Sequence, residues 1–333
     1  MATFHRRAAR LSLLIALGCG GNASVPVDAG HALDGAFAKD TILFGGSGLV
    51  ATTGDTWAWD GSAWTQLDVT GPSPRQGAAM ASLHGTLVLV GGEVQGQMAP
   101  IYPPDTWTWD GRAWISVAAS GPNAGEWSSM APLGDTLVLF GGTALTDAVS
   151  GGEDVVGVTF SEATWTWDGT QWTHIDGQGP EPRFSATMAP LGDKVVLFGG
   201  MSANSTYLGD TWTFDGSTWT QLDVTGPSAR ASSVMAPLGD TLVLFGGSDG
   251  STDGADDTWT FDGTSWTKLA VSGPPGRSSA MLTPSGGVLV LFGGVESPSS
   301  NPYADTWAFD GTAWTSVAMT GPDGRSDAVM ATP

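Results

Sequence analysis

The sequence predicts an all-β protein folded as a six-bladed β-propeller, and three observations support this prediction. Glycine is abundant, at 49 of 333 residues, and it separates short segments rich in Thr, Val and Trp, as expected for strands joined by tight turns. No segment beyond the N-terminus has a convincing helical period. A unit of about 50 residues with four strand signals recurs six times, which is typical of propeller blades.

Each repeat carries the same signals in the same order. An apolar segment ending in Gly-Gly, such as LFGG at 139–142, predicts a second strand, and a loop of variable length follows it. An aromatic third strand, an Asp-Gly turn and a fourth strand with Trp come next, as in DTWTWDGRAW at 105–114. A Gly-Pro connection then leads to the first strand of the next blade. The turn glycines are Gly61, Gly111, Gly169, Gly216, Gly263 and Gly311, with spacings of 50, 58, 47, 47 and 48.

The two ends of the repeat region complement each other. The segment GRSDAVMATP at 324–333 matches the first strand ARASSVMAPL at 229–238, but no second strand follows it. The segment DTILFGG at 40–46 is a second strand without a clear first strand. We therefore expect a propeller over 41–333 in which blade one consists of 41–67 plus 325–332. The C-terminal strand would then complete the N-terminal blade, which removes exposed sheet edges.

The repeat resembles that of the kelch family. The resemblance rests on the apolar strand with Gly-Gly, the aromatic strand, the later Trp, and the Arg that precedes the next first strand, and it spans about residues 40–333. It implies a propeller fold and does not specify a function, because one fold supports many functions.

The repeated tryptophans are expected to be structural. Fifteen of the sixteen lie at repeated positions. Trp57 and Trp59 are two residues apart and therefore share one face of their strand. Both faces of an inner propeller strand contact other blades, so we expect these side chains to be buried, each hiding about 150–250 Å².

An arginine opens five first strands and an aspartate opens five third strands. Blade three lacks both, with Gly125 and Ala163 in their places. Because the two residues disappear together, we expect a bidentate Arg–Asp pair within each of the other five blades. The alternative is a ring of arginines that binds an anion. The predicted pairs are Arg75–Asp105, Arg183–Asp210, Arg230–Asp257, Arg277–Asp305 and Arg325–Asp55.

Function is expected where the repeats differ. Because strand direction alternates, the loops after Gly-Gly and the Gly-Pro connections share one face, and rigid folds carry binding sites on such loops. These loops are 8, 12, 21, 9, 9 and 10 residues long. Aromatic residues outside the repeat pattern lie on that face and are candidate ligand-binding residues, although the alternative is that they fix the loops to the ring. They are Tyr102, Trp127, Phe184, Tyr207 and Tyr303.

The N-terminus predicts export. The basic start HRRAAR and the apolar run LSLLIALG indicate a signal segment over 1–18 that is too short to span a bilayer. Ala16-Leu17-Gly18-Cys19 resembles the lipobox of bacterial lipoproteins, which implies a lipid on Cys19; the alternative is an ordinary secreted protein. Residues 19–40 would form a flexible tether. Gly20 is not the Asp that retains some lipoproteins at the inner membrane, so the outer membrane, periplasm or cell surface is favoured.

Composition and motifs favour a binding role. The net charge of −21 argues against nucleic acid and against anionic membranes, which would leave a lipid anchor as the only membrane contact. No catalytic or metal-ligand cluster is recognised, and no cofactor is expected, although calcium binding by the acidic segment 248–257 stays open. We expect a monomeric, non-enzymatic module that presents its variable loops to a protein or glycan of the cell envelope.

The resemblance also implies an alternative function. Six-bladed exported kelch proteins include sialic-acid mutarotases, which act on sugars by acid–base chemistry. Glu126 and Glu181, at the starts of first strands, would be the candidates for such a role because neither belongs to the repeat.

Overall fold

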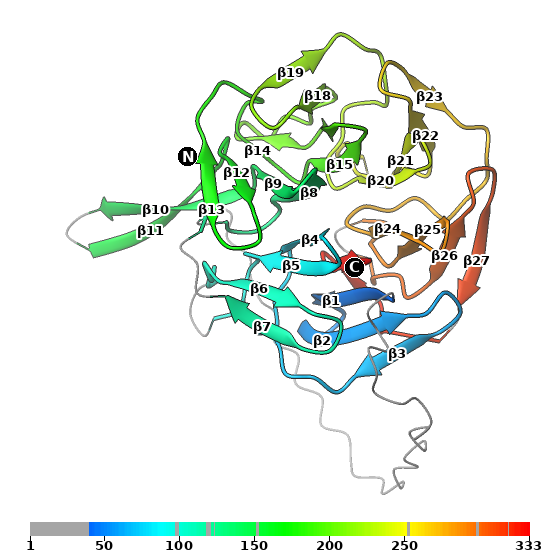
Figure 1. Cartoon of the computed structure of the whole chain (residues 1–333), viewed down its shortest axis with the longest axis horizontal. Helices are drawn as coiled ribbons and strands as arrows, with labels where there is room; N and C mark the ends of the chain where they lie inside the picture. The colour runs from blue at the N-terminus through cyan, green and yellow to red at the C-terminus, as the bar shows by residue number, and fades with distance from the viewer. Residues whose placement is uncertain are drawn as a thin grey trace, which may run out of the picture. The chain divides into compact units, whose positions relative to one another are not determined.

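The computed structural model describes residues 40–333 except 97–99, 118–120, 123, 151–152, 252–253, 298–299 and 319. The described chain is entirely strand and loop, arranged as antiparallel sheets in a ring (Figure 1). First strands of neighbouring sheets contact one another around the centre. The predicted all-β, six-bladed propeller is therefore confirmed. The expected signal segment and Cys19 lie outside the described residues, and within those residues there is no helix long and apolar enough to cross a membrane.

The strands of each blade follow the order expected from the repeat. Blade one contains β1 (Thr41–Gly48), β2 (Thr52–Trp59), β3 (Trp64–Leu67), β28 (Arg325–Ser326) and β29 (Val329–Ala331). Blade two contains β4 (Ala79–Leu83), β5 (Thr86–Val90), β6 (Thr106–Trp109) and β7 (Trp114–Val117). Blade three contains β8 (Ser129–Leu133), β9 (Thr136–Phe140), β12 (Thr164–Trp167) and β13 (Trp172–Ile175), with a hairpin of β10 (Thr143–Ser150) and β11 (Glu153–Phe160).

The other three blades repeat this arrangement. Blade four contains β15 (Thr187–Leu191), β16 (Lys194–Phe198), β18 (Thr211–Phe214) and β19 (Trp219–Leu222), with the short pair β14 (Arg183–Phe184) and β17 (Met201–Ser202). Blade five contains β20 (Val234–Leu238), β21 (Thr241–Phe245), β22 (Thr258–Phe261) and β23 (Trp266–Lys268). Blade six contains β24 (Met281–Ser285), β25 (Val288–Phe292), β26 (Thr306–Phe309) and β27 (Trp314–Ala318).

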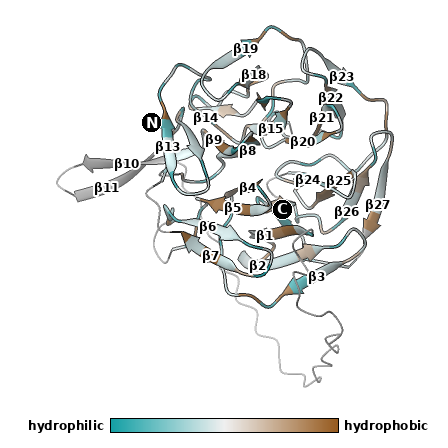
Figure 2. Ribbon diagram, in the orientation of Figure 1, coloured by the Kyte–Doolittle hydropathy of each residue, from teal (hydrophilic) through white to brown (hydrophobic). Residues whose placement is uncertain are grey.

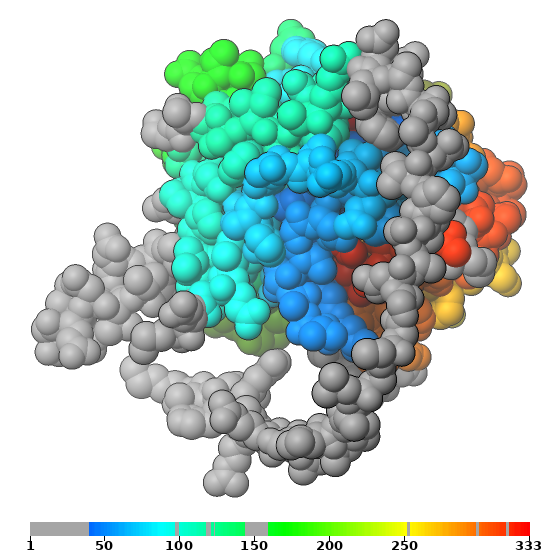
Figure 3. All heavy atoms as spheres, turned by 90° about the horizontal axis from the view of Figure 1, so that it is seen from below, coloured from blue at the N-terminus to red at the C-terminus, as the bar shows by residue number. Residues whose placement is uncertain are grey.

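Both ends of the repeat region meet in blade one. β1 pairs with β2 on one side and with β28 and β29 on the other, so that Leu43 lies opposite Met330. Thr41 and Thr332 add a hydrogen bond of 2.8 Å between their hydroxyl oxygens. In Figure 3 the red C-terminal residues lie directly beside the blue residues of blade one. The ring is therefore closed by the C-terminal strand, which ends at Ala331, one residue before the predicted boundary.

The second strands form the most apolar part of each blade. In β25 the side chains of Leu289 through Phe292 are almost completely buried, and they pack against residues of the neighbouring blades. Figure 2 shows β1, the corresponding strand of blade one, in the brown of apolar residues. This burial on both faces explains the uninterrupted LVLF pattern, which has no polar alternation.

The fourth-strand tryptophans join neighbouring blades. Trp114 Nε1 of blade two donates a hydrogen bond of 3.0 Å to Thr56 Oγ1 of blade one, and a Cβ atom on Gly71 would lie 2.6 Å from Trp114 Cδ1. The same indole–hydroxyl bond occurs at every one of the six boundaries, including Trp64 to Thr306 at 2.9 Å across the closure. One contact between blades thus explains why Thr, Trp and the Gly of Gly-Pro recur together.

The third-strand tryptophans behave differently from one another. The second of each pair, such as Trp59, is buried as expected. The first, such as Trp57, is only half-buried, so the expectation that both are buried was wrong for this position. The indole N–H of Trp57 donates a 2.6 Å hydrogen bond to the partly exposed Asp55, and this bond keeps one edge of the ring near the surface.

Blade two offers a matched pair of tryptophans for measuring the bond between blades. The indole nitrogen of Trp109 is buried without a hydrogen-bond partner among the described residues, whereas that of Trp114 is bonded to Thr56. Blades four to six carry Phe at the position of Trp109. We expect Trp114→Phe to lower the free energy of unfolding by about 1–3 kcal/mol more than Trp109→Phe, because only the former leaves a buried hydroxyl unpaired. Urea unfolding followed by circular dichroism measures the difference, and equal losses would contradict this account.

Candidate functional site

The loops that differ between repeats gather on one face, which we call the variable-loop face. Backbone hydrogen bonds connect each Gly-Pro-Arg connection to the preceding blade's loop, as from Arg75 N to Thr53 O at 3.1 Å and from Arg230 N to Leu208 O at 2.9 Å. Two of the loops are hairpins rather than irregular segments, and Figure 1 shows the one made by β10 and β11 pointing away from the ring. The segments that define this face are 47–54, 93–104, 143–163, 201–209, 248–256 and 295–304.

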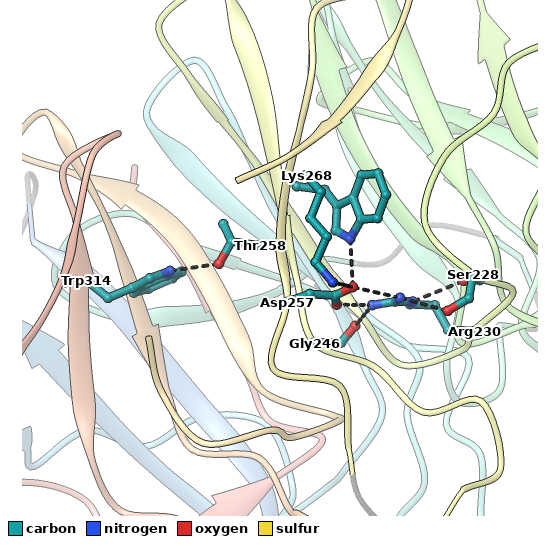
Figure 4. A network of polar contacts seen from close by, with 8 residues as sticks. Ser228, Arg230, Gly246, Asp257, Thr258, Lys268 and Trp314 are labelled. Carbon is teal, nitrogen blue, oxygen red and sulfur yellow. Dashed lines mark hydrogen bonds and ion pairs between the residues drawn. The ribbon is translucent and has the colours of Figure 1, made fainter. Parts of the chain in front are cut away.

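The Arg–Asp pair of blade five illustrates the scaffold at this face (Figure 4). Arg230 Nη1 lies 2.6 Å from Asp257 Oδ1 and also donates to Gly246 O at 3.0 Å. Its Nη2 donates to Asp257 Oδ2 at 3.2 Å and to Ser228 Oγ at 2.9 Å. The indole of Trp259 donates to the same carboxylate at 2.8 Å. The guanidinium therefore ties the first, second and third strands of the blade together at their ends.

All five predicted pairs lie in contact, and in each the shortest distance from Nη1 to Oδ1 is 2.6 Å. The arginines are at most 3% exposed, so they are not available to an anion on the surface. Burial raises the pKa of each aspartate, but hydrogen bonds from the arginine and the indole outweigh this effect and hold the pKa below its usual value. None of these five arginines has a free guanidinium group, which argues against the alternative of an anion-binding arginine ring.

Blade three replaces the missing pair with smaller groups. The Ser128 hydroxyl donates to Gly141 O at 3.0 Å, the carbonyl that an arginine bonds in the other blades. Thr143 Oγ1 accepts a 2.8 Å hydrogen bond from Glu126 N. A Cβ atom at Gly125 would collide with the Thr143 hydroxyl, so the backbone of blade three has no room for an arginine at this position.

Six backbone hydrogen bonds form a closed ring around the centre of the propeller. Each blade contributes one residue, whose N–H donates to the carbonyl of the equivalent residue in the preceding blade, at 2.7–3.1 Å. All six residues have φ between 52° and 63°, a backbone region that residues other than glycine rarely adopt. A hollow of about 120 Å³ is lined by this central ring and its neighbours. The ring residues are Gly77, Trp127, Ser185, Ser232, Ser279 and Asp327.

Two of the candidate aromatic residues meet between blades three and four. Trp127 and Phe184 have ring centroids 5.4 Å apart, and Phe184 stacks on Phe160 of β11 at 4.8 Å. The other edge of the Trp127 indole lies over Gly77, where an added Cβ would be 3.2 Å from Nε1. Trp127 also interacts with the Asp327 carboxylate. These aromatic residues therefore link the hairpin of blade three to the central ring, which is the loop-fixing arrangement.

The three tyrosines are dispersed over separate blades. Tyr102 Oη lies 3.4 Å from Glu93 Oε2. Tyr207 packs against the loop of blade five, where a Cβ on Gly250 would be 2.9 Å from its ring. Tyr303 lies flat on the guanidinium of Arg277, with 4.0 Å between Cζ and the ring centroid. Tyr303 thus covers an Arg–Asp pair, so its removal is expected to lower stability, unlike that of an isolated surface residue.

A group of acidic residues from blades one, two and three lies beside the central ring. Glu126 is 4% exposed, and its Oε2 has no hydrogen-bond partner among the described residues. Burial, together with the nearby Glu93 and Asp327 carboxylates, raises the pKa of Glu126 to about 8. The same surroundings raise the pKa of Tyr102 to about 12. Burial also raises the pKa of Asp327, which bonds to Ser326 Oγ at 2.9 Å.

Other sequence candidates do not join this group. Glu181 is exposed, and its backbone carbonyl accepts a 3.1 Å hydrogen bond from Arg183 Nε. In the acidic segment 248–257, Asp257 is engaged by Arg230, and Asp249 bonds to the backbone of its own turn. Across the part of the chain that the structure describes, no three His, Cys, Asp or Glu side chains are placed to hold a metal ion.

Sequence reasoning missed Glu93 and Asp327. Both lie at positions where the other repeats carry different, mostly small residues. Each therefore departs from the repeat pattern, as Glu126 does. Their proximity depends on how neighbouring blades pack, because Glu93 belongs to blade two, Asp327 to blade one and Glu126 to blade three. A comparison of acidic residues by repeat position would have identified all three.

The geometry defines a kelch-type β-propeller. A family model described as the KLHDC2/KLHL20/DRC7 Kelch-repeats domain matches residues 128–332, which is more than half of the chain. The chain therefore belongs to the kelch-repeat family, as its repeat predicted. No curated protein matches it.

Blade four tests the Arg–Asp pair. We expect Arg183→Met to lower the free energy of unfolding by about 3–5 kcal/mol, because Asp210 would remain partly buried without its counterion. The double variant Arg183→Met/Asp210→Ala should recover much of this loss, since blade three closes without the pair. Because the pKa of Asp210 is lowered, the pair stabilises the fold above about pH 4, and this contribution is lost on acidification. Urea unfolding at pH 7 measures the effect; a double variant no better than the single one would contradict it.

Glu126 should make stability depend on pH in the opposite direction. Its raised pKa means that the folded protein keeps a proton which the unfolded chain releases above about pH 4.5, so folding is opposed increasingly as the pH rises to 8. We expect Glu126→Gln to raise the melting temperature, with a gain that is small at pH 5 and largest at pH 8. Glu181→Gln, at an exposed site, is the control, and a gain independent of pH would contradict the burial of a titrating carboxyl.

Proposed function

We propose that this protein is a binding module whose variable-loop face holds a protein or glycan partner in the bacterial cell envelope. Kelch propellers are protein-interaction scaffolds, which supports the general class of function. The observation that carries the proposal is that the repeated residues and the loops that differ between repeats have separate roles. Repeated polar residues are engaged within or between blades, whereas the loops that differ are left to contact a partner.

Exposed apolar side chains support a contact role for this face. Leu49 and Val50 at the tip of the β1–β2 hairpin are 68% and 95% exposed, and Ile101 in the loop of blade two is 55% exposed. Isolated surface apolar residues are common, but these three lie in loops of adjacent blades on one face. They would add an apolar component to an interface whose other side chains are mostly polar.

The envelope location is a part of the proposal that rests on the sequence. Export and lipid attachment at Cys19 follow from the basic start, the apolar run and the lipobox-like segment before the cysteine. A lipid there would leave residues 19–40 as a tether between the membrane and blade one.

A crosslinking pull-down from envelope extract tests the binding module. The bait is the protein itself, compared with a variant in which 144–161 is replaced by a short Gly-Ser turn. The matched control, Asp135→Asn/Asp193→Asn, alters two turns on the opposite face. We expect a partner that the protein and the control capture and that the loop variant loses. Capture of the same proteins by all three baits, or by none, would refute binding by this face.

A further inference from the structure

The variable-loop face has no free cation among the described residues. Its five arginines are buried in pairs with aspartates. Of the other described cations, Arg112 in a turn and Lys194 at the start of β16 lie at the opposite face. Lys268, on an outer strand, is engaged by Asp257 at 3.5 Å.

Glutamate has a distribution that aspartate does not share. Many aspartates open third strands or support turns; in one such turn Asp215 Oδ1 accepts hydrogen bonds from the amides of Ser217 and Thr218. The glutamates have no repeated structural position, and all of them lie in the loops or connections of the variable-loop face. They are Glu93, Glu126, Glu153, Glu162, Glu181 and Glu296.

Glu126 provides independent evidence that this face can accept a hydrogen bond from a ligand. Its Oε2 is buried, and no described residue donates a hydrogen bond to it. When Glu126 is ionised, its buried oxygen without a donor is unfavourable, and an ammonium or guanidinium group relieves both the missing hydrogen bond and the repulsion from Glu93. The partly exposed Glu93 and Tyr102 of the blade-two loop are joined by a long 3.4 Å contact, and Glu93 lies beside Glu126.

We propose that the variable-loop face binds a lysine- or arginine-bearing segment of a protein partner, and that one cationic side chain of this segment lies against Glu93 and Glu126. This inference rests on the proposed binding function and names the chemistry of its partner. The exposed Glu162, Glu181 and Glu296 add negative charge to the same face, which attracts a basic segment and accelerates its encounter. Leu49, Val50 and Ile101 would contact apolar residues of the same segment.

Binding of a cation should release a proton. Glu93, Tyr102 and Asp327 are the titratable groups that act on Glu126, and the neutral Gln76 forms a side-chain hydrogen bond with the same carboxyl, although its Oε2 has no partner among the described residues. With a pKa of about 8, Glu126 is mostly protonated at pH 7, and an adjacent cation would lower this pKa. Affinity is therefore expected to rise with pH between about 6 and 8.5.

Isothermal titration with synthetic peptides tests the site. One nine-residue probe carries three lysines among glycine and leucine, and its twin carries acetyl-lysine instead. We expect the lysine probe alone to bind, with a proton release at pH 7 that is revealed by two buffers of different ionisation enthalpy. Glu93→Gln/Glu126→Gln should weaken binding at least tenfold and abolish the release, while Asp135→Asn/Asp193→Asn, which removes two charges from the opposite face, should change affinity less than twofold.

The outcomes separate this inference from the proposed function. Absence of lysine-dependent binding, or equal weakening by both double variants, would overturn the basic-segment site. If the loop-dependent partner is nevertheless captured from envelope extract, the binding function stands with a partner of other chemistry. If neither is observed, both fail. Melting temperatures exclude misfolding as a cause, because Glu126→Gln is expected to stabilise the fold.

Discussion

Closure of the ring is the constraint on which the rest of the structure depends. A blade buries its faces only when it has a neighbour on each side, so every boundary must use compatible contacts. The indole–hydroxyl bond between Trp and Thr meets this requirement at six boundaries, and Trp64 to Thr306 repeats it where the chain ends meet. The strong sequence repetition follows from this geometric identity of the boundaries rather than from a shared ligand.

The scaffold uses its polar residues almost entirely for itself. Arginine and aspartate hold strand ends together within a blade, threonine and tryptophan join blades, and turn aspartates bond their own backbone. The Oε2 atom of Glu126 is an exception, because no described residue forms a hydrogen bond with it. The unpaired oxygen of Glu126 lies in the blade that has lost the Arg–Asp pair, so loss of a structural pair and gain of a distinctive acidic group coincide in one blade.

Much of this architecture could be predicted from the sequence because it repeats. The simultaneous replacement of the arginine by Gly125 and of the aspartate by Ala163 in blade three predicted an Arg–Asp contact, and this contact is present in all five other blades. Individual departures were harder to interpret. The grouping of Glu93 with Glu126 depends on packing between blades, and the central ring is made by backbone atoms of residues as different as Gly77 and Trp127. Neither arrangement has a local sequence signature, since no spacing along the chain encodes it.

The pairing of β29 with β1 has a consequence for folding kinetics. These strands are neighbours in space, yet almost the whole propeller separates them along the chain. Contacts of such sequence separation form late, because a long loop must close before they can be made. Until Val329–Ala331 arrives, β1 has one unpaired edge of apolar residues, a surface that favours association with other chains. Pairing of the last few residues of the described chain with β1 is therefore the step that covers this edge and converts an aggregation-prone intermediate into a closed ring.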